Sequence, residues 1–233
     1  MKKLILAATL LFVFAFVNAQ SLDEIVKKYS AANKLDNLSK VSTIKITSKT
    51  SVMGQDMPIE TWMKNPDKIK VVTTAGGMSI VMAFDGQKGY MINPTTGSND
   101  PVEMDMNMVK QQIANRNMFQ NSLATMYKNG SLSLESEEVV NGKPAFKIKQ
   151  TTEGAVSYLY IDKGTFLAVK ASTTVNQGGQ SISVDSYPSD YKETNGVMVP
   201  MVTKQSLSGM DIVTTIVKVE VNIPMEDNVF KLK

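Results

Sequence analysis

Residues 57–94 read MPIETWMKNPDKIKVVTTAGGMSIVMAFDGQKGYMINP, and this stretch decides the expected fold of the chain. Its apolar residues recur at every second position, which is the period of a β-strand with one buried face. Asn65-Pro66-Asp67 and Asp85-Gly86 are turn sequences, because proline fixes φ and Asp-Gly accepts the positive φ of a tight hairpin. The stretch therefore predicts four short strands in an antiparallel meander.

One face of this meander is apolar and rich in methionine, whereas the opposite face carries residues such as Glu60, Trp62 and Lys64. Methionine is unbranched and polarizable, so it fills irregular gaps in a core and also forms adaptable binding surfaces. With 16 methionines in the chain, a packed core and a ligand-binding wall are both open interpretations of this face. Its residues are Met57, Ile59, Met63, Met78, Ile80, Met82 and Phe84.

The first 19 residues predict a signal peptide. Lys2 and Lys3 precede an uncharged apolar run over residues 4–17, and Val17-Asn18-Ala19 is a small-residue cleavage site. The run is too short to cross a bilayer comfortably, which needs about 20 apolar residues. We expect cleavage after Ala19 and a soluble protein exported to the periplasm.

Histidine and cysteine are both absent from the 233 residues. The missing histidine removes the usual general base, the Ser-His nucleophile pair and the commonest zinc ligand, and the missing cysteine removes disulfides. Two of the net positive charges, Lys2 and Lys3, lie in the predicted signal peptide, so the formal charge of +3 gives no argument for nucleic acid. We expect one non-enzymatic domain over residues 20–233, with no metal and no cofactor.

An amphipathic helix is predicted from Ser21 to about Asn33. Ser21 and Glu24 fit a capping box, in which their side chains satisfy backbone amides at a helix start. The simplest interpretation is that the apolar side of this helix packs on the sheet and does not lie on a membrane. The apolar residues at helical spacing are Leu22, Ile25, Val26 and Tyr29.

Helical spacing returns only once, in the middle of the chain, and predicts two short helices that end near Gly130, a suitable C-cap. Met104, Met106 and Met108 follow one another closely, and adjacent positions on one helix cannot all face one core. This favours a ligand-binding role for some of these methionines. The two apolar stripes are Met106, Val109 and Ile113, followed by Phe119, Leu123 and Met126.

Strand and turn signals alternate over the rest of the chain, with Asn-Gly at 141–142 and 195–196. Together with a strand that starts at Val41, they predict a mainly β protein with a few helices and about eleven strands in one large antiparallel sheet. Such a sheet cannot lie flat, so it should curl into an incomplete, half-open β-barrel with an N-terminal helix and a mid-chain helical lid. Its interior is either packed or a cavity, and a packed interior would argue against a carrier. For a cavity the natural ligand is an acyl chain, since each buried methylene contributes about 0.8 kcal/mol.

Four segments resemble the LolA-like periplasmic carriers of outer-membrane lipoproteins, in the version common in Bacteroidetes. They are WMKNPDKIK at 62–70, SIVMAFDGQKGYMINP at 79–94, DYKETNGVMVP at 190–200 and VEVNIPMEDNVF at 219–230, and they span most of the mature chain in order. The resemblance implies a monomeric carrier that takes acyl chains of lipoproteins, or other lipids, from an inner-membrane release complex to an outer-membrane acceptor. It also implies that the seven apolar residues from Met57 to Phe84 line a concave wall and that residues Met106 to Met126 form the lid.

One position departs from the family pattern. Better-known members have an arginine before the proline of the second-strand turn, and this arginine holds the lid closed, whereas Asn65 stands here. The single arginine of this chain is Arg116, between the two predicted lid helices, where a solvated loop residue is the simplest interpretation.

Two other functions remain as alternatives. One is a non-enzymatic module on the same fold that senses lipid or lipoprotein, or that binds another protein. The other is a hydrolase that uses carboxylates such as Asp185, Asp190 or Glu220, although these residues show no distinctive pairing in the sequence.

Overall fold

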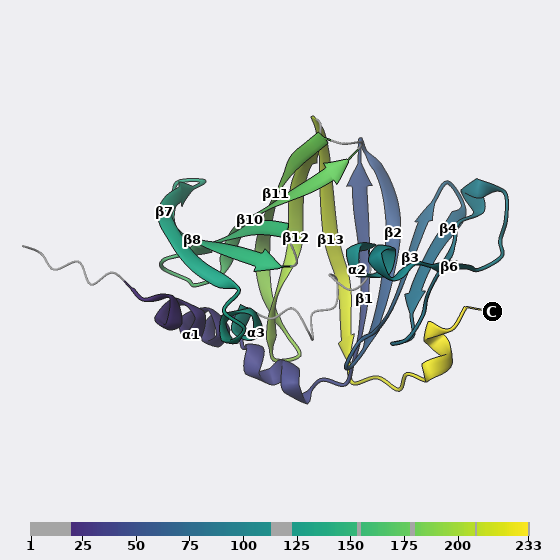
Figure 1. Cartoon of the computed structure of the whole chain (residues 1–233), viewed down its shortest axis with the longest axis horizontal. Coiled ribbons are helices and arrows are strands. Elements are labelled where there is room, and N and C mark those ends of the chain that lie inside the picture. Colours follow the sequence, from purple (N-terminus) through teal and green to yellow (C-terminus); the bar gives the residue numbers. More distant parts are fainter. Residues whose placement is uncertain (1–19, 113–122, 153–154, 178–179, 208, 233) are drawn as a thin grey trace, which may run out of the picture.

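The computed structural model describes residues 20–112, 123–152, 155–177, 180–207 and 209–232. In these ranges thirteen strands form one antiparallel sheet in the order β6-β5-β4-β3-β2-β1-β13-β12-β11-β10-β9-β8-β7 (Figure 1). The sheet curls but is not closed, because β6 and β7 are its two edges. The predicted half-open barrel is therefore confirmed, with more strands than the eleven expected.

The strands are β1 (Thr43–Val52), β2 (Gln55–Lys64), β3 (Lys68–Ala75), β4 (Met78–Phe84), β5 (Gly89–Ile92), β6 (Val102–Met104), β7 (Leu132–Val140), β8 (Lys143–Thr152), β9 (Ala155–Asp162), β10 (Ala168–Gln177), β11 (Gln180–Thr194), β12 (Val197–Leu207) and β13 (Met210–Val221). The α-helices are α1 (Leu22–Ala32), α2 (Met106–Gln112) and α3 (Leu123–Lys128), and the 3-10 helices are η1 (Leu35–Lys40), η2 (Pro94–Thr96) and η4 (Asp227–Phe230). The stretch 57–94 thus holds most of β2 and all of β3, β4 and β5, the predicted meander.

Helix α1 begins as its sequence predicts. The Ser21 hydroxyl accepts a hydrogen bond from the Glu24 backbone amide at 3.3 Å, which satisfies one of the free amides at the helix start. Ile25 and Val26 turn to the sheet and are buried. The helix packs on the sheet, as the simpler interpretation of its apolar side expected.

Helix α3 ends in a Schellman motif. Gly130 has a φ of 69°, its amide donates to the Tyr127 carbonyl at 3.0 Å, and the Ser131 amide donates to the Met126 carbonyl at 2.9 Å. This confirms Gly130 as the C-cap, because glycine adopts a left-handed backbone without a Cβ clash.

The three methionines at 104, 106 and 108 do not lie on one helix, which corrects the interpretation based on helical spacing. Met104 is the last residue of β6 and is 5% exposed, whereas α2 begins at Met106. Asp105 separates the two elements, since its carboxylate accepts from the Asn107 and Met108 amides at 2.9 Å and caps α2. A three-residue strand is too short to show its period in the sequence.

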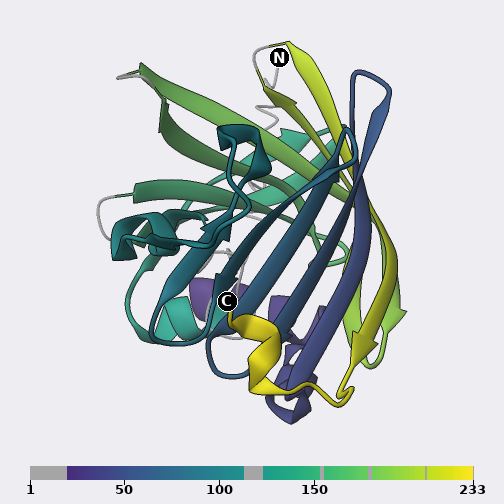
Figure 2. The ribbon, with the colours of Figure 1, turned by 90° about the vertical axis from the view of Figure 1, so that its right-hand side faces the viewer.

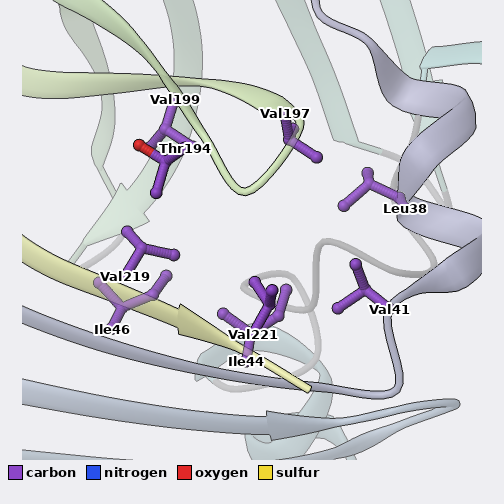
Figure 3. A pocket seen from close by; sticks show the side chains of 9 residues that line it. All are labelled: Leu38, Val41, Ile44, Ile46, Thr194, Val197, Val199, Val219 and Val221. Carbon is purple, nitrogen blue, oxygen red and sulfur yellow. The ribbon is translucent and has the colours of Figure 1, made fainter. Parts of the chain in front are cut away.

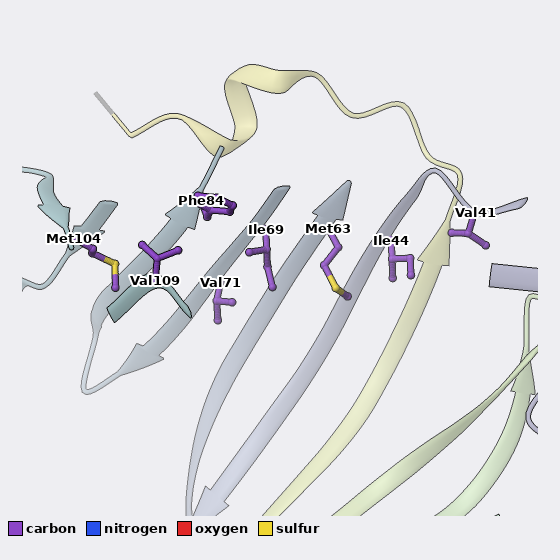
Figure 4. Packing of buried hydrophobic residues seen from close by; sticks show 8 residues of the cluster. All are labelled: Val41, Ile44, Met63, Ile69, Val71, Phe84, Met104 and Val109. Carbon is purple, nitrogen blue, oxygen red and sulfur yellow. The ribbon is translucent and has the colours of Figure 1, made fainter. Parts of the chain in front are cut away.

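Two apolar clusters cover different parts of the concave face. The first joins β1–β4, β6 and α2 through Val41, Ile44, Met63, Ile69, Val71, Phe84, Met104 and Val109 (Figure 4). The second joins α1, α3 and β7–β9 through Ile25, Val26, Leu123, Leu132, Phe146, Ile148 and Ile161. The central strands β10–β13 link the two halves of the sheet.

Some predictions fall outside the described residues. These are the signal peptide over residues 1–19 and the lid residues Ile113, Arg116 and Phe119.

Candidate functional site

The seven apolar residues predicted for one face do share that face. Strand register places Met63 opposite Ile69, and Ile69 opposite Phe84 on the next strand. Ile80 lies opposite Thr73, which in turn lies opposite Ile59. Since side chains alternate along a strand, Met57, Ile59, Met63, Met78, Ile80, Met82 and Phe84 all point to the concave side. We call these seven residues the concave wall.

Exposure of the concave wall changes along the strands. At one end Met63 is 2% exposed and Phe84 is 9% exposed. Towards the β1–β2 and β3–β4 turns, Met57 and Ile80 are half-buried and Met78 is 45% exposed. The wall therefore closes into a packed core at one end and stays accessible at the other.

Charged side chains of β1–β4 all lie on the opposite, convex face. Lys45 pairs with Glu60 at 3.2 Å, and its ammonium also lies 4.9 Å from the centre of the Trp62 ring. Lys70, opposite Trp62 on β3, has its ammonium 5.7 Å from the centre of the same ring. The lysine stems cover the tryptophan on the convex face, while the concave side of these strands carries only uncharged residues.

Helix α2 is seated on β5 by one close contact. A Cβ atom built on Gly89 would lie 2.2 Å from Cγ2 of Val109, far inside van der Waals distance. Val109 is 1% exposed and contributes to the first apolar cluster (Figure 4). Met106, on the same helix, is 47% exposed. The predicted lid residue Val109 thus covers the strands of the concave wall, and Met106 does not.

The predicted lid residue Leu123 lies elsewhere. It is 4% exposed and packs in the second cluster with Ile25 of α1 and Phe146 of β8. The structure therefore separates the two described lid segments, with α2 over one half of the sheet and α3 over the other.

An apolar cavity of about 30 Å³ lies on the concave side between η1 and the strands β1, β13, β12 and β11 (Figure 3). All of its lining is aliphatic except Thr194. None of the nine lining residues was among the predicted site residues, although Val197/Val199 and Val219/Val221 show the two-residue period of a strand with one apolar face. The lining consists of Leu38, Val41, Ile44, Ile46, Thr194, Val197, Val199, Val219 and Val221.

The carboxylates of the hydrolase alternative each have a lysine partner. Asp185 pairs with Lys170 at 2.7 Å, Asp190 with Lys192 at 3.1 Å, and Glu220 with Lys218 at 2.7 Å. Partial burial alone would raise the pKa of Asp185, but the hydrogen bonds and charge supplied by Lys170 and Ser172 outweigh it and hold that pKa below its usual range. A general acid needs the opposite shift, so the geometry of Asp185 does not favour this role.

Asn65, the position at which the sequence departs from the pattern that it resembles, is exposed at the turn between β2 and β3. Its backbone amide donates to the Ser42 carbonyl at 2.9 Å. Within the described ranges no three Asp or Glu side chains gather as a metal site, and no helix has the length and apolar character to cross a membrane.

Neither protein-family models nor curated proteins match this sequence. Solved structures do match it. A DUF1329 family protein from Desulfovibrio piger is 12% identical, with 89% of this chain and 97% of that one covered and a TM-score of 0.61. A LolA superfamily protein from Nitrosomonas europaea is 13% identical, with coverage of 91% and 98% and a TM-score of 0.59. A domain described as an outer membrane lipoprotein-sorting protein, from Vibrio parahaemolyticus, is 11% identical, with coverage of 89% and 94% and a TM-score of 0.58.

These matches define the class of the protein by its fold. The chain has a LolA-like fold over nearly its whole described length. At such low identity the likeness concerns the fold alone.

Proposed function

We propose that this protein is a periplasmic, non-enzymatic carrier that binds the acyl chains of lipoproteins, or other lipids, on its concave face. The observation that carries the proposal is the concave wall, which is apolar across β2–β4, free of charge, and still accessible near the turns. An acyl chain needs no more than such a surface, because its affinity grows with each buried methylene. The lipoprotein-sorting description of one structural relative supports this choice of ligand.

Binding must be coupled to opening of the interior. The cavity of about 30 Å³ has the volume of about one water molecule, whereas ligand pockets occupy about 300–1,000 Å³. A long acyl chain therefore does not fit in this cavity, and binding along the packed part of the concave wall would require α2 to lift from Gly89 or the two apolar clusters to separate. The structure describes only seven residues of α2, and a short helix that opens at low cost would also let the carrier release its cargo.

The proposed route is the one that the resemblance to LolA-like carriers implies. A lipoprotein leaves an inner-membrane release complex, crosses the periplasm with its acyl chains shielded by a carrier monomer, and passes to an outer-membrane acceptor. Export would follow from cleavage of the predicted signal peptide after Ala19.

The test compares two aspartate substitutions on β4. Met82→Asp places a charge on the concave side, and Ser79→Asp places the same charge on the exposed convex side of the same strand. We expect wild type and Ser79→Asp to bind an acyl-chain fluorophore equally, and Met82→Asp to bind at least about tenfold more weakly with an unchanged far-UV spectrum, because a buried unpaired charge is costly.

A series of fatty acids of increasing length provides a second measurement. Affinity should rise by up to about fourfold per methylene until the interior is filled. If the wild-type protein bound no acyl ligand of any length, the carrier proposal would be wrong. Retention of a partner protein by both wild type and Met82→Asp, without lipid, would instead favour the sensing module.

A further inference from the structure

The β1–β2 hairpin ends in a turn whose sequence is unusual for its backbone. Met53 and Gly54 have φ values of 50° and 81°, as in a type I′ turn, where both central residues are left-handed. Two other hairpins have nearly the same values with Asn141-Gly142 (49° and 79°) and Asn195-Gly196 (51° and 82°). Asparagine tolerates this conformation through local hydrogen bonds of its short side chain, and methionine has no such compensation. The backbone therefore gives no reason for Met53.

Packing gives no reason for it either, because the Met53 side chain is 83% exposed. Phe166 provides a contrast within the same chain. Its φ is 56°, but its ring stacks on Phe146 with ring centres 6.3 Å apart, so packing offsets the unfavourable backbone. Met53 bears a similar conformational cost and buries almost nothing in the monomer.

Two neighbouring hairpins also present exposed methionines. Met210 follows the β12–β13 turn and is 40% exposed, and Met78 follows the β3–β4 turn and is 45% exposed. Because β12, β13, β1, β2, β3 and β4 pair antiparallel in unbroken sequence, these turns all lie at one end of the sheet. Figure 2 shows the β1–β2 turn and the adjoining ends of β12 and β13 together at the top of the ribbon. We call Met53, Met78 and Met210 the apolar rim.

We propose that the apolar rim docks on the surface of a lipid bilayer. A stable protein partner, or a second copy of the chain, needs a continuous surface of about 800 Å² on each side. Three methionines on separate turns do not form such a surface, but a bilayer accepts apolar side chains one at a time, with a gain set by the area that each buries. The shape of the rim thus favours lipid over protein.

The charges beside the apolar rim indicate which lipid head groups are needed for docking. Lys49 is neutralised by Asp56 at 2.7 Å, and Asp211 directly follows Met210. The turns therefore carry no excess of positive charge that would attract anionic head groups. Docking should occur on zwitterionic lipid and should depend little on salt.

Docking at this end would place the accessible part of the concave wall next to the membrane. Met57 and Ile80 lie on the strands that lead away from the rim, and both are half-buried. The inference does not require an acyl chain inside the protein, so its failure would leave the proposed carrier function intact. Conversely, an empty carrier that binds no fatty acid can still show docking.

The experiment measures co-sedimentation of the chain from Gln20 onward, which contains every described element of the fold, with phosphatidylcholine vesicles. Met53→Asn restores the turn sequence that the other two hairpins use, so this variant should be at least as stable as wild type in thermal unfolding. Its partition onto vesicles should nevertheless fall about tenfold, the loss expected for one large apolar side chain. Met210→Thr should lower it further.

The matched control is Asn141→Met, which places the same side chain on the same turn geometry at the β7–β8 hairpin. Its vesicle partition should equal that of wild type. Equal binding by wild type and Met53→Asn would overturn the proposal, as would binding that disappears in high salt or an equal gain in the Asn141→Met control. A dimer that is lost in Met53→Asn, without vesicle binding, would assign the rim to a second copy and also overturn it.

Discussion

The contact between Val109 of α2 and Gly89 of β5 allows a direct test of how the interior opens. In Gly89→Ala the new methyl would lie 2.2 Å from Cγ2 of Val109, so the helix must retreat by about 1 Å or lift away. Full loss of Val109 burial costs about 1.5–3 kcal/mol, and the gain from replacing a glycine offsets about 0.4–1 kcal/mol. We expect a net destabilisation of about 1–2 kcal/mol.

A double-mutant cycle separates this contact from other effects. Val109→Ala removes Cγ2, so the Gly89→Ala/Val109→Ala double variant should cost about as much as Val109→Ala alone, with a coupling of about 1 kcal/mol or more. Urea unfolding measures the change in the free energy of unfolding of the whole protein, and hydrogen exchange of residues 106–112 measures local release of α2. Gly164→Ala is the control, since its Cβ would meet nothing nearer than 3.4 Å. If the free-energy changes of the two substitutions were strictly additive, the proposed contact between Val109 and Gly89 would be refuted.

Two further predictions concern the cavity and the C-terminal segment. Val199→Ile adds one methylene to the lining of the 30 Å³ cavity. It should therefore stabilise the protein by up to about 0.8 kcal/mol in urea unfolding and weaken acyl binding. If neither the stability nor the acyl affinity changed, Val199 would not line a cavity that can be filled. Hydrogen bonds from Lys64 and Lys68 hold the pKa of Asp227 at about 2, below its ordinary 3.8. A depressed carboxylate pKa stabilises the fold above the ordinary value and loses this effect as the pH falls towards 2. The melting temperature of Asp227→Asn should thus lie below that of wild type at neutral pH and converge with it at about pH 2; a constant difference would exclude this ion pair as the cause.

On the convex face, long lysine side chains lie over the aromatic rings of a third apolar cluster, formed by Val140, Ala145 and Tyr160. On β8–β10, Lys147 lies 4.8 Å from the Tyr158 ring centre, and Lys170 lies 5.1 Å from that of Tyr160. Tyr160 is only 5% exposed although it lies on the same face as these lysines. Long lysine stems thus cover aromatic rings and present ammonium groups to water, which keeps this face polar.

The local features of the sequence were sufficient for the parts of the fold that depend on near neighbours. The two-residue period from Met57 to Phe84 correctly assigned each side chain to a face, because alternation is a property of any extended strand. Ser21 and Gly130 marked the ends of α1 and α3, since caps act through backbone groups within one helical turn. A local pattern contains no information about which distant strand pairs with a given strand.

Tertiary structure alone decided the arrangement of the site. The cavity combines Ile44 of β1 with Val199 and Val219, which meet only because β1 pairs with β13 across most of the chain. Val109 closely approaches Gly89, Met104 lies on an edge strand, and the described residues of the predicted lid divide between two clusters. These features are likewise consequences of long-range pairing. The period of residues 57–94 defines an apolar face, but only the curl of the thirteen-stranded sheet makes that face concave, closes one end of it and leaves the other open.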